Sequence, residues 1–362
     1  MPILSIPGER ALENRRVPLS LWPTRTQRAD SLYPVAIPRF ERSFTIDRSD
    51  KIFCIGSCFA REIEAVLHRE GFDVLSRASA GGAGPSVTPP NVYSVPAIHQ
   101  IVRAALGDDD ASSHPAGVKM EMFSALSKST VLMVTLGLSE AWFDRESNVY
   151  LNEMPAVRAL RASPDRYELR VLDFPETVDF LAATLQGVSE RLPACRILLT
   201  VSPVPLYCTF RSEDVFLSNA YSKSVLRTAV EHVRREFPHI SYFPSYEMAT
   251  LSDPRVVWGD GDYRHVDREF VSVIVSHAMA SLAPSEASRF ELKREESMRL
   301  LHAKLDAPNT QRGGARALEA AVLGRLLDPR KLRKYQRGRD AFFEDSGHPL
   351  AKAYGRLTRR RA

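Results

Sequence analysis

Three absences narrow what this 362-residue chain can be. It has no apolar run near the roughly 18–20 residues that a membrane-spanning helix needs, which argues against an integral membrane protein. Its first residues lack a charged segment followed by an apolar stretch, so we do not expect a secreted protein. Its four cysteines have neither the density of a disulfide scaffold nor the paired spacing of a CxxC motif. Together these absences favour a cytoplasmic protein with reduced thiols.

Sequence motifs for cofactors are also missing. No Gly-x-x-x-x-Gly-Lys phosphate loop occurs, and Gly81-Gly-Ala-Gly84 is not followed by the start of a helix. No group of His and Cys has the spacing of a metal site. We therefore expect neither a cofactor nor a metal.

Positive charge is concentrated near one end of the chain. The net charge is +5, but residues 315–362 hold 13 Lys and Arg against 5 Asp and Glu, so the remainder is mildly acidic. A basic tail is weaker evidence for nucleic acid than a basic domain face, and charge runs are usually solvated helix faces. We expect no nucleic-acid partner, and recruitment of RNA or an anionic membrane by the tail ranks as a third hypothesis.

The chain divides into three parts by composition. Residues 1–50 are rich in proline and arginine without sustained periodicity, which predicts an extended arm with a short strand near 43–46. Residues 51–285 alternate short apolar runs with helical patterns. Residues 286–362 show charged helical patterns at 286–305, 314–327 and 340–354 and no strand candidate, which predicts a basic helical extension.

Residues 51–285 carry the signature of a parallel sheet. Expected strands lie at 51–55, 72–76, 129–136, 195–201 and 240–243, and expected helices at 59–70, 95–106, 174–192, 219–237 and 266–282. Continuous apolar strands that alternate with helices indicate βαβ units whose sheet is covered on both faces. The sequence therefore predicts a three-layer α/β/α domain, with a long loop at 78–96.

Ser57 stands where the first expected strand becomes a helix. In parallel sheets, ligands bind at the carboxyl ends of the strands, and a helix N-terminus there favours developing negative charge. These are the surroundings that a nucleophilic serine needs. A helix N-cap is the commoner role of such a serine, although Ala60 stands where a capping box would have Glu or Gln. Cys58, one residue further on, is a second candidate nucleophile.

The segment Asp262-Tyr-Arg-His265 supplies a base for such a nucleophile. A carboxylate three residues before a histidine can accept a hydrogen bond from Nδ1 and leave Nε2 as general base. Asp260 and Asp267 compete with Asp262 as the orienting carboxylate, and their alternative roles are turn formation and helix capping.

Gly56-Ser-Cys-Phe-Ala60 is the motif after which the GSCFA family is named, and the sequence resembles that family. Further blocks resemble it in the same order: Thr135-Leu-Gly-Leu-Ser-Glu-Ala-Trp142, Thr200-Val-Ser-Pro-Val-Pro205, Asn219-Ala-Tyr-Ser-Lys-Ser-Val-Leu226 and Tyr242-Phe-Pro-Ser-Tyr-Glu247. The resemblance spans residues 50–285. The family in turn is similar to the SGNH (GDSL-like) hydrolases.

The resemblance implies a flavodoxin-like sandwich with Ser57 as nucleophile, His265 as base and Asp262 as the residue that orients it. The oxyanion hole of that superfamily includes a glycine and an asparagine from later blocks, but this chain has no asparagine after its third strand. Gly137, the Ser57 N–H and Asn91 are the replacements. Gly81, Gly82 and Gly84 stay open as the second-block glycine.

The function that follows is a serine esterase or O-acyltransferase, acting through an acyl-enzyme on an O-acylated carbohydrate or similar small hydroxylated substrate. The alternative is a carbohydrate-binding or scaffold module that keeps the fold without turnover. Lys223 and Ser222 either contact a substrate or lie on a solvated helix face. Trp142 and Trp258 either line a pocket or pack in the core.

Overall fold

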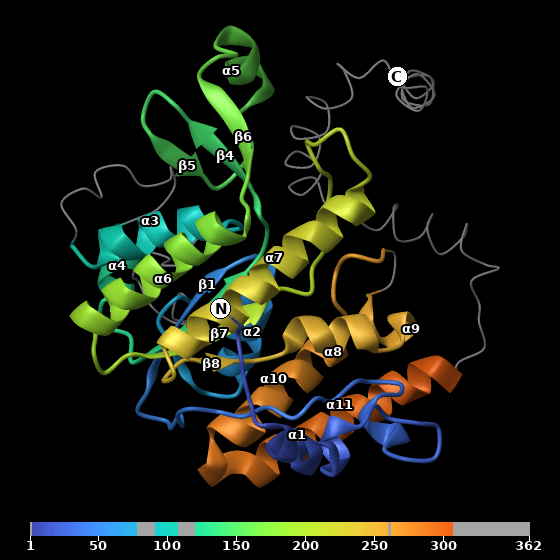
Figure 1. Ribbon diagram of the computed structural model, residues 1–362. Coiled ribbons are helices and arrows are strands. Elements are labelled where there is room, and N and C mark those ends of the chain that lie inside the picture. Colours follow the sequence, from blue (N-terminus) through green and yellow to red (C-terminus); the bar gives the residue numbers. More distant parts are fainter. Residues whose placement is uncertain (1, 78–90, 108–119, 260–261, 307–362) are drawn as a thin grey trace, which may run out of the picture. The chain divides into compact units, whose positions relative to one another are not determined.

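The computed structural model describes residues 2–77, 91–107, 120–259 and 262–306 (Figure 1). The described residues up to 155 and from 162 to 306 form one compact unit, to which residues 156–161, nearly all of them in helix α5 (Val157–Ala162), do not belong. The helices expected at 314–327 and 340–354 and the glycines at 81, 82 and 84 lie outside the described residues. All that follows concerns the first unit.

A parallel five-stranded sheet forms the centre of this unit. Its order is β2-β1-β3-β7-β8, and the strands are β1 (Lys51–Gly56), β2 (Asp73–Val74), β3 (Val131–Leu136), β7 (Arg196–Val201) and β8 (Ser241–Tyr242). Counted among these five strands alone, the order is 2-1-3-4-5, which is that of flavodoxin-like doubly wound sheets. The predicted three-layer α/β/α fold is confirmed.

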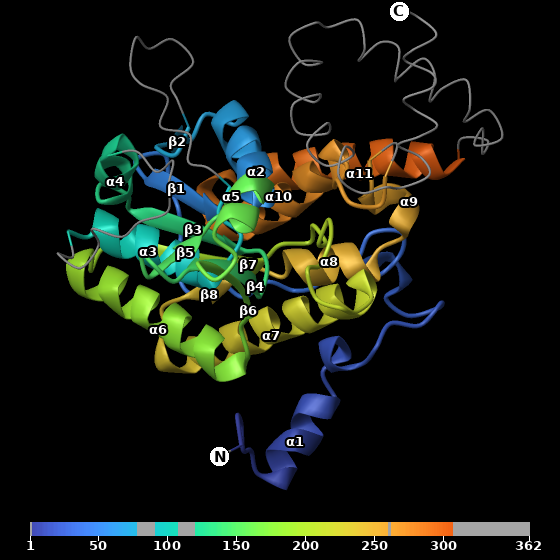
Figure 2. The ribbon, with the colours of Figure 1, turned by 90° about the horizontal axis from the view of Figure 1, so that it is seen from above.

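Side chains alternate between the two faces of each strand, and each face is covered by its own helices. Cys54 and Met133, which lie opposite each other in β1 and β3, face α2, α10 and α11. Phe53 and Leu132 face α3, α4, α6 and α7. Figure 2 shows these two helical layers on either side of the sheet. Because both faces are buried, the strands read as continuous apolar runs in the sequence.

The described helices include those expected at 59–70, 95–106, 174–192, 219–237, 266–282 and 286–305, together with shorter ones that were not predicted, such as those at 8–15 and 245–251. They are α1 (Gly8–Arg15), α2 (Cys58–Arg69), α3 (Val95–Ala105), α4 (Met120–Leu126), α6 (Phe174–Arg191), α7 (Val215–Glu236), α8 (Ser245–Leu251), α9 (Pro254–Val257), α10 (Arg268–Leu282) and α11 (Ala287–Asp306). Helix α6 starts with a full capping box between Asp173 and Glu176. Helices α7 and α10 start at the caps Asp214 and Asp267, so Asp267 has the capping role rather than that of orienting His265.

A second sheet, which the sequence analysis missed, follows β3. Its strands β4 (Glu140–Asp144), β5 (Val149–Leu151) and β6 (Tyr167–Val171) are antiparallel in the order β5-β4-β6. These strands are only three to five residues long and mix charged with aromatic residues. Such segments give too short a periodicity to be recognised.

The N-terminal 50 residues differ from the predicted extended arm. Residues 8–15 form helix α1, and the strand expected at 43–46 is absent from the described structure. Instead the Ile46 N–H donates to the Leu282 carbonyl at the end of α10 (2.7 Å). Ile46, Val35 and Phe40 are buried in the core that α10 forms, so residues 35–46 pack as part of the domain, whereas α1 buries no residue.

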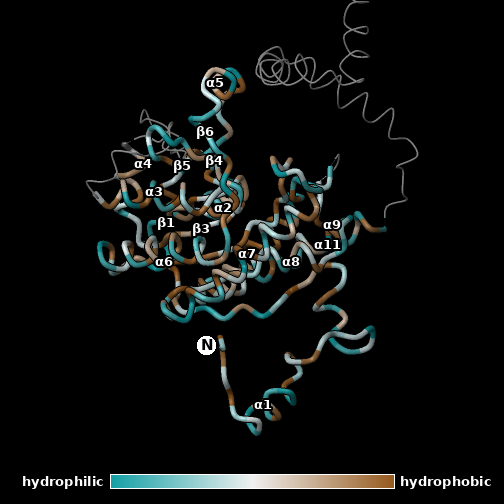
Figure 3. The backbone as a smooth tube through the Cα atoms, turned by 45° about the horizontal axis from the view of Figure 1, so that its top comes forward, coloured by the Kyte–Doolittle hydropathy of each residue, from teal (hydrophilic) through white to brown (hydrophobic). Residues whose placement is uncertain are grey.

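Helix α11, the first part of the predicted basic extension, packs along α10. Its Phe290 and Leu301 are fully buried in the same core. Hydrophilic and hydrophobic residues follow one another at short intervals along the chain (Figure 3). None of the described helices is both long and apolar enough to cross a membrane.

Candidate active site

A cavity of about 320 Å³ lies at the carboxyl ends of β1, β3 and β7. Ser57 and Cys58 from the end of β1, Gly137 from the end of β3, and residues 204–208 after β7 line it. The added sheet contributes Glu140 to Trp142 and residues 151–154, and Arg264 enters from the loop before α10. The strand-end rule of parallel sheets therefore located the cavity correctly.

Ser57 is the N-cap of α2 and also lines the cavity. Its Oγ accepts the Phe59 N–H (3.3 Å) and lies 3.3 Å from Thr135 Oγ1. Its own N–H donates to the Thr135 carbonyl (3.2 Å), so this predicted oxyanion donor is already engaged. Only 3% of Ser57 is exposed, which places its hydroxyl at the bottom of the cavity beside the positive end of α2.

Two glycines make room for Ser57. Gly56 has φ +132°, and a Cβ there would lie 2.1 Å from the Thr135 carbonyl oxygen. A Cβ on Gly137 would lie 2.6 Å from the Tyr93 carbonyl oxygen and 3.4 Å from Ser57 Cβ. Gly137 therefore lies beside Ser57 in the cavity, and its role as an oxyanion donor stays a prediction. Within the described chain, no acceptor is recorded for the Gly137 N–H.

Asp262 and His265 form the predicted pair. His265 Nδ1 lies 2.5 Å from Asp262 Oδ2, and Asp262 Oδ1 accepts the backbone N–H groups of Arg264 (2.9 Å) and His265 (2.8 Å). Partial burial raises the pKa of Asp262, but these hydrogen bonds outweigh it and bring the pKa to about 2. The Asp262 carboxylate is therefore ionised at neutral pH and fixes the ring of His265.

The loop that carries this pair is closed by backbone contacts. Trp258 and Val266 form an antiparallel bridge, and the Gly259 N–H donates to the His265 carbonyl (2.8 Å). Trp258 packs against the core of the α10 layer rather than in the cavity. Asp260, the remaining competitor for the orienting role, lies outside the described residues.

His265 Nε2 faces Arg264 in this structure. The Arg264 Nη1 lies 3.5 Å from His265 Nε2, and Arg264 lines the cavity while His265 does not. The described residues include no hydrogen bond between Ser57 and His265. The structure therefore contains the Asp262–His265 pair and, in the cavity that Arg264 lines, Ser57. The serine and the histidine are not hydrogen-bonded to each other.

Asn91 does not line the cavity but contacts a residue that does. Its Nδ2 donates to the hydroxyl of Tyr93 (3.2 Å), and Tyr93, not Asn91, lines the cavity. Burial raises the pKa of Tyr93, so its hydroxyl stays protonated and is able to donate a hydrogen bond. Tyr93 was missed because it follows the long glycine-rich loop, where no periodicity indicates its direction.

Lys223 and Ser222 lie neither on a solvated helix face nor in the cavity. Both are fully buried. The Lys223 Nζ donates to the carbonyls of Gly137 (2.8 Å) and Val204 (2.9 Å), and Ser222 Oγ accepts the Ser139 N–H (2.7 Å). Helix α7 thus fixes the turns that follow β3 and β7 through these hydrogen bonds. Burial lowers the pKa of Lys223 to about 7.

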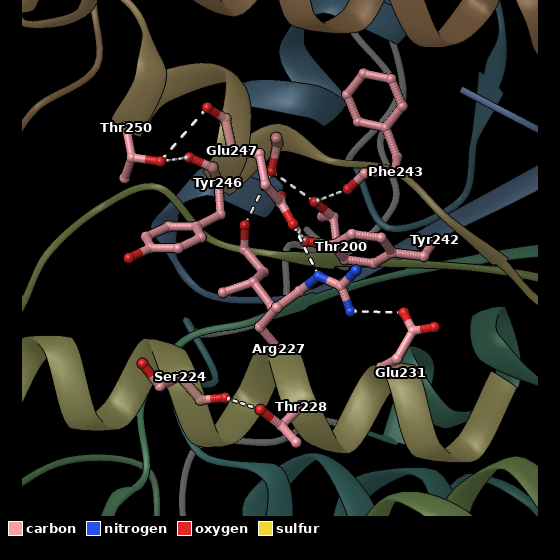
Figure 4. A network of polar contacts seen from close by, with 12 residues as sticks. Thr200, Ser224, Arg227, Thr228, Glu231, Tyr242, Phe243, Tyr246, Glu247 and Thr250 are labelled. Atoms are coloured by element: carbon pink, nitrogen blue, oxygen red, sulfur yellow. Dashed lines mark hydrogen bonds and ion pairs between the residues drawn. The ribbon is translucent and has the colours of Figure 1, made fainter. Parts of the chain in front are cut away.

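A polar network fixes α7 against the sheet one turn after Lys223 (Figure 4). Arg227 pairs with Glu231 on its own helix and with Glu247 on α8. The hydroxyl of Tyr242, at the end of β8, donates to both carboxylate oxygens of Glu247 (2.7 and 3.0 Å). These contacts tie α7, α8 and the sheet edge together, so the position of Lys223 is set by the fold.

Aromatic side chains form the outer wall of the cavity. Trp142 and Phe210 meet edge to face, with ring centroids 5.2 Å apart. The indole N–H of Trp142 and the side-chain amide of Asn152 also line the cavity, and both are buried without a hydrogen-bond partner among the described residues. Trp142 therefore lines the pocket, which was one of its two predicted roles.

Two thiols border the same cavity. Burial raises the pKa of Cys58 and of the more exposed Cys208. Both are therefore neutral thiols near pH 7, which disfavours Cys58 as the nucleophile. Among the described residues, no group of three or more His, Cys, Asp or Glu side chains is arranged to hold a metal ion.

Comparison with known proteins supports one family. Residues 116–277 match the model of the GSCFA family. The matched region includes Gly137, Lys223, Asp262 and His265, and it begins after Ser57. No curated protein matches the chain.

Proposed function

We propose that the protein is a serine esterase or O-acyltransferase that works through an acyl-enzyme on Ser57. One observation carries the proposal: Ser57 lies in an open cavity at the N-terminus of α2, and the loop with a preformed Asp262–His265 pair adjoins that cavity through Arg264. The resemblance to SGNH hydrolases and the family match over residues 116–277 support the same assignment.

The reaction would begin with attack of Ser57 Oγ on an ester carbonyl. A bond forms between Oγ and the carbonyl carbon, the hydroxyl proton passes to His265 Nε2, and the carbonyl electron pair moves onto oxygen. When the intermediate collapses, the ester C–O bond breaks and the leaving alcohol takes the proton from His265. Water or an acceptor hydroxyl then releases the acyl group by the same steps in reverse.

The Gly137 N–H is the backbone donor that we assign to the oxyanion. Gly137 lines the cavity together with Ser57, and the Lys223 Nζ donates to its carbonyl. Removal of a single such donor typically lowers kcat by a factor of about 10²–10³. Tyr93 is a candidate for the second donor in place of the predicted Asn91.

Proton transfer requires His265 Nε2 to come within about 3 Å of Ser57 Oγ. Nε2 must therefore leave Arg264, its neighbour in this structure. The same contact favours the second candidate function, a module that binds a carbohydrate against Trp142 and Phe210 without turnover. The two functions differ in whether Ser57 is reactive.

Labelling with a fluorophosphonate probe separates them. We expect the wild-type protein to be labelled, Ser57→Ala to be unlabelled, and His265→Ala to be labelled at least a hundredfold more slowly. Ser94→Ala, which removes another cavity serine, is the matched control and should label like the wild type. Equal labelling of Ser57→Ala and wild type, or none of either, would favour the binding module.

A further inference from the structure

The charged side chains that line the cavity are Glu140, Glu153 and Arg264. Glu140 is buried, and its carboxylate already accepts hydrogen bonds from Thr209 Oγ1 (2.6 Å) and the Phe210 N–H (3.3 Å). Glu153 is exposed at the cavity edge. Of these three side chains, only that of Arg264 donates hydrogen bonds.

The guanidinium of Arg264 lacks an anionic partner within the described part of the chain. No carboxylate there lies within ion-pair distance of it, and its buried Nε has no hydrogen-bond partner. Its recorded side-chain contacts are His265 Nε2, at 3.5 Å from Nη1, and the face of Tyr207, at 5.2 Å from Cζ. A guanidinium carries five donors in a planar fork that matches a carboxylate or phosphate.

Arg264 lines the cavity together with Cys58, Tyr93 and Cys208. Its charge lowers the pKa values of Cys58, Cys208 and Tyr93, against the larger effect of burial. These three residues come from the ends of β1 and β7 and from the segment before α3, so one guanidinium influences three sides of the cavity. Because Arg264 and Ser57 line the same cavity, a ligand that fills this cavity can contact both side chains.

We propose that the substrate carries an anionic group, a carboxylate or a phosphate, and that Arg264 binds this group beside the acylated hydroxyl. The proposal rests on the proposed function and narrows its substrate class from acylated carbohydrates in general to acidic ones.

The contact between Arg264 and His265 links binding of the anionic group to the state of the proposed base. In the present structure the guanidinium donates towards Nε2, the atom that has to accept the serine proton. An anion that draws the guanidinium towards itself frees Nε2, so binding of the acidic group and release of the base are coupled.

Direct binding tests the inference without any turnover. We would measure galacturonate, galactose 6-phosphate and galactose by calorimetry against wild type, Arg264→Gln and Arg264→Lys. We expect the wild type to bind at least one of the anions about tenfold to a hundredfold more tightly than galactose, since hydrogen bonds to charged groups are the stronger ones. Whichever anion binds more tightly identifies the group as carboxylate or phosphate.

In Arg264→Gln that preference should fall at least tenfold, and Arg264→Lys should keep part of it. Arg255→Gln is the matched control, because Arg255 lies on α9 outside the cavity and pairs with Asp253. Its binding should equal that of the wild type. No preference of the wild type for either anion, or an unchanged preference in Arg264→Gln, overturns the inference.

Turnover gives an independent reading. With O-acetylated galacturonate and O-acetylated galactose as substrates, the ratio of their kcat/KM values should fall at least tenfold in Arg264→Gln, mainly through KM of the acidic ester. Fluorophosphonate labelling of the wild type tests the proposed function separately. Absent labelling with intact anion preference would reject the esterase and leave the acidic-ligand site standing.

Discussion

Lys223→Met tests the most unusual group in the fold, a fully buried ammonium whose hydrogen-bond acceptors are two backbone carbonyls. Burial lowers the pKa of Lys223 from 10.5 to about 7. Above about pH 7 the folded protein therefore loses the proton, while the unfolded chain holds it up to about pH 10.5. Because the unfolded state binds more protons in this window, stability rises with pH through it. Below pH 7 both states are protonated and the desolvation cost is present in full.

The magnitude follows from the size of the shift. A pKa shift of this size changes the free energy of unfolding by up to about 5 kcal/mol between pH 7 and pH 10.5. About 2.5 kcal/mol of this change falls between pH 6 and pH 9. Methionine fills a similar volume and cannot titrate. The free energy of unfolding of the wild type should therefore gain about 2.5 kcal/mol relative to Lys223→Met between pH 6 and pH 9.

Urea unfolding at several pH values measures this difference directly. Cys58, whose charge would act on Lys223, stays a thiol over most of this range because burial raises its pKa. Lys293→Met, at a half-exposed position on α11, is the control, and its curve should run parallel to that of the wild type. Parallel curves for Lys223→Met as well would refute the reasoning and show that the two carbonyls keep the ammonium charged.

Three further substitutions probe the site and its support. Asp262→Asn should lower kcat for ester hydrolysis by about 10⁴, because the imidazole loses the carboxylate that fixes its tautomer; a loss below tenfold would argue against the pair. Gly137→Ala places a Cβ 2.6 Å from the Tyr93 carbonyl oxygen, so we expect about 1–3 kcal/mol of destabilisation in urea unfolding and slower fluorophosphonate labelling. Burial raises the pKa of Glu64, on α2, to about 7, so the folded state binds its proton more tightly and stability falls as pH rises from 4.5 to 7. Glu64→Gln should remove this fall of about 3 kcal/mol between pH 4.5 and pH 8; equal slopes for variant and wild type would contradict it.

The sequence predicted the parallel sheet and the position of Ser57 for one shared reason. A buried parallel strand is an uninterrupted apolar run, and the residue that follows it necessarily lies at the carboxyl edge. Ser57 and Gly137 could be placed by that rule, whereas the loop of Asp262 and His265 was singled out because it directly precedes helix α10. Their contacts with one another could not, since a contact between Nε2 and Arg264 depends on side-chain directions that no pattern encodes.

What the sequence analysis missed has physical reasons too. Lys223 looked like a solvated residue because lysine is rarely buried without a carboxylate, and here the free carbonyls of two turns accept its hydrogen bonds. The sheet of β4 to β6, which brings Trp142 to the cavity, consists of strands too short for their period to stand out.

The two roles considered for Ser57, helix cap and nucleophile, can be separated by one substitution because they need different chemistry from the same oxygen. A cap needs only an acceptor for the Phe59 N–H, and asparagine caps about as well as serine, whereas alanine typically costs about 1 kcal/mol. A nucleophile needs a hydroxyl. Ser57→Asn should therefore be more stable than Ser57→Ala in urea unfolding and, like it, inert to the fluorophosphonate. If Ser57→Asn instead bound galacturonate like the wild type and the wild type itself resisted the probe, the serine would be a cap alone, and the cavity would be a binding site rather than an active site.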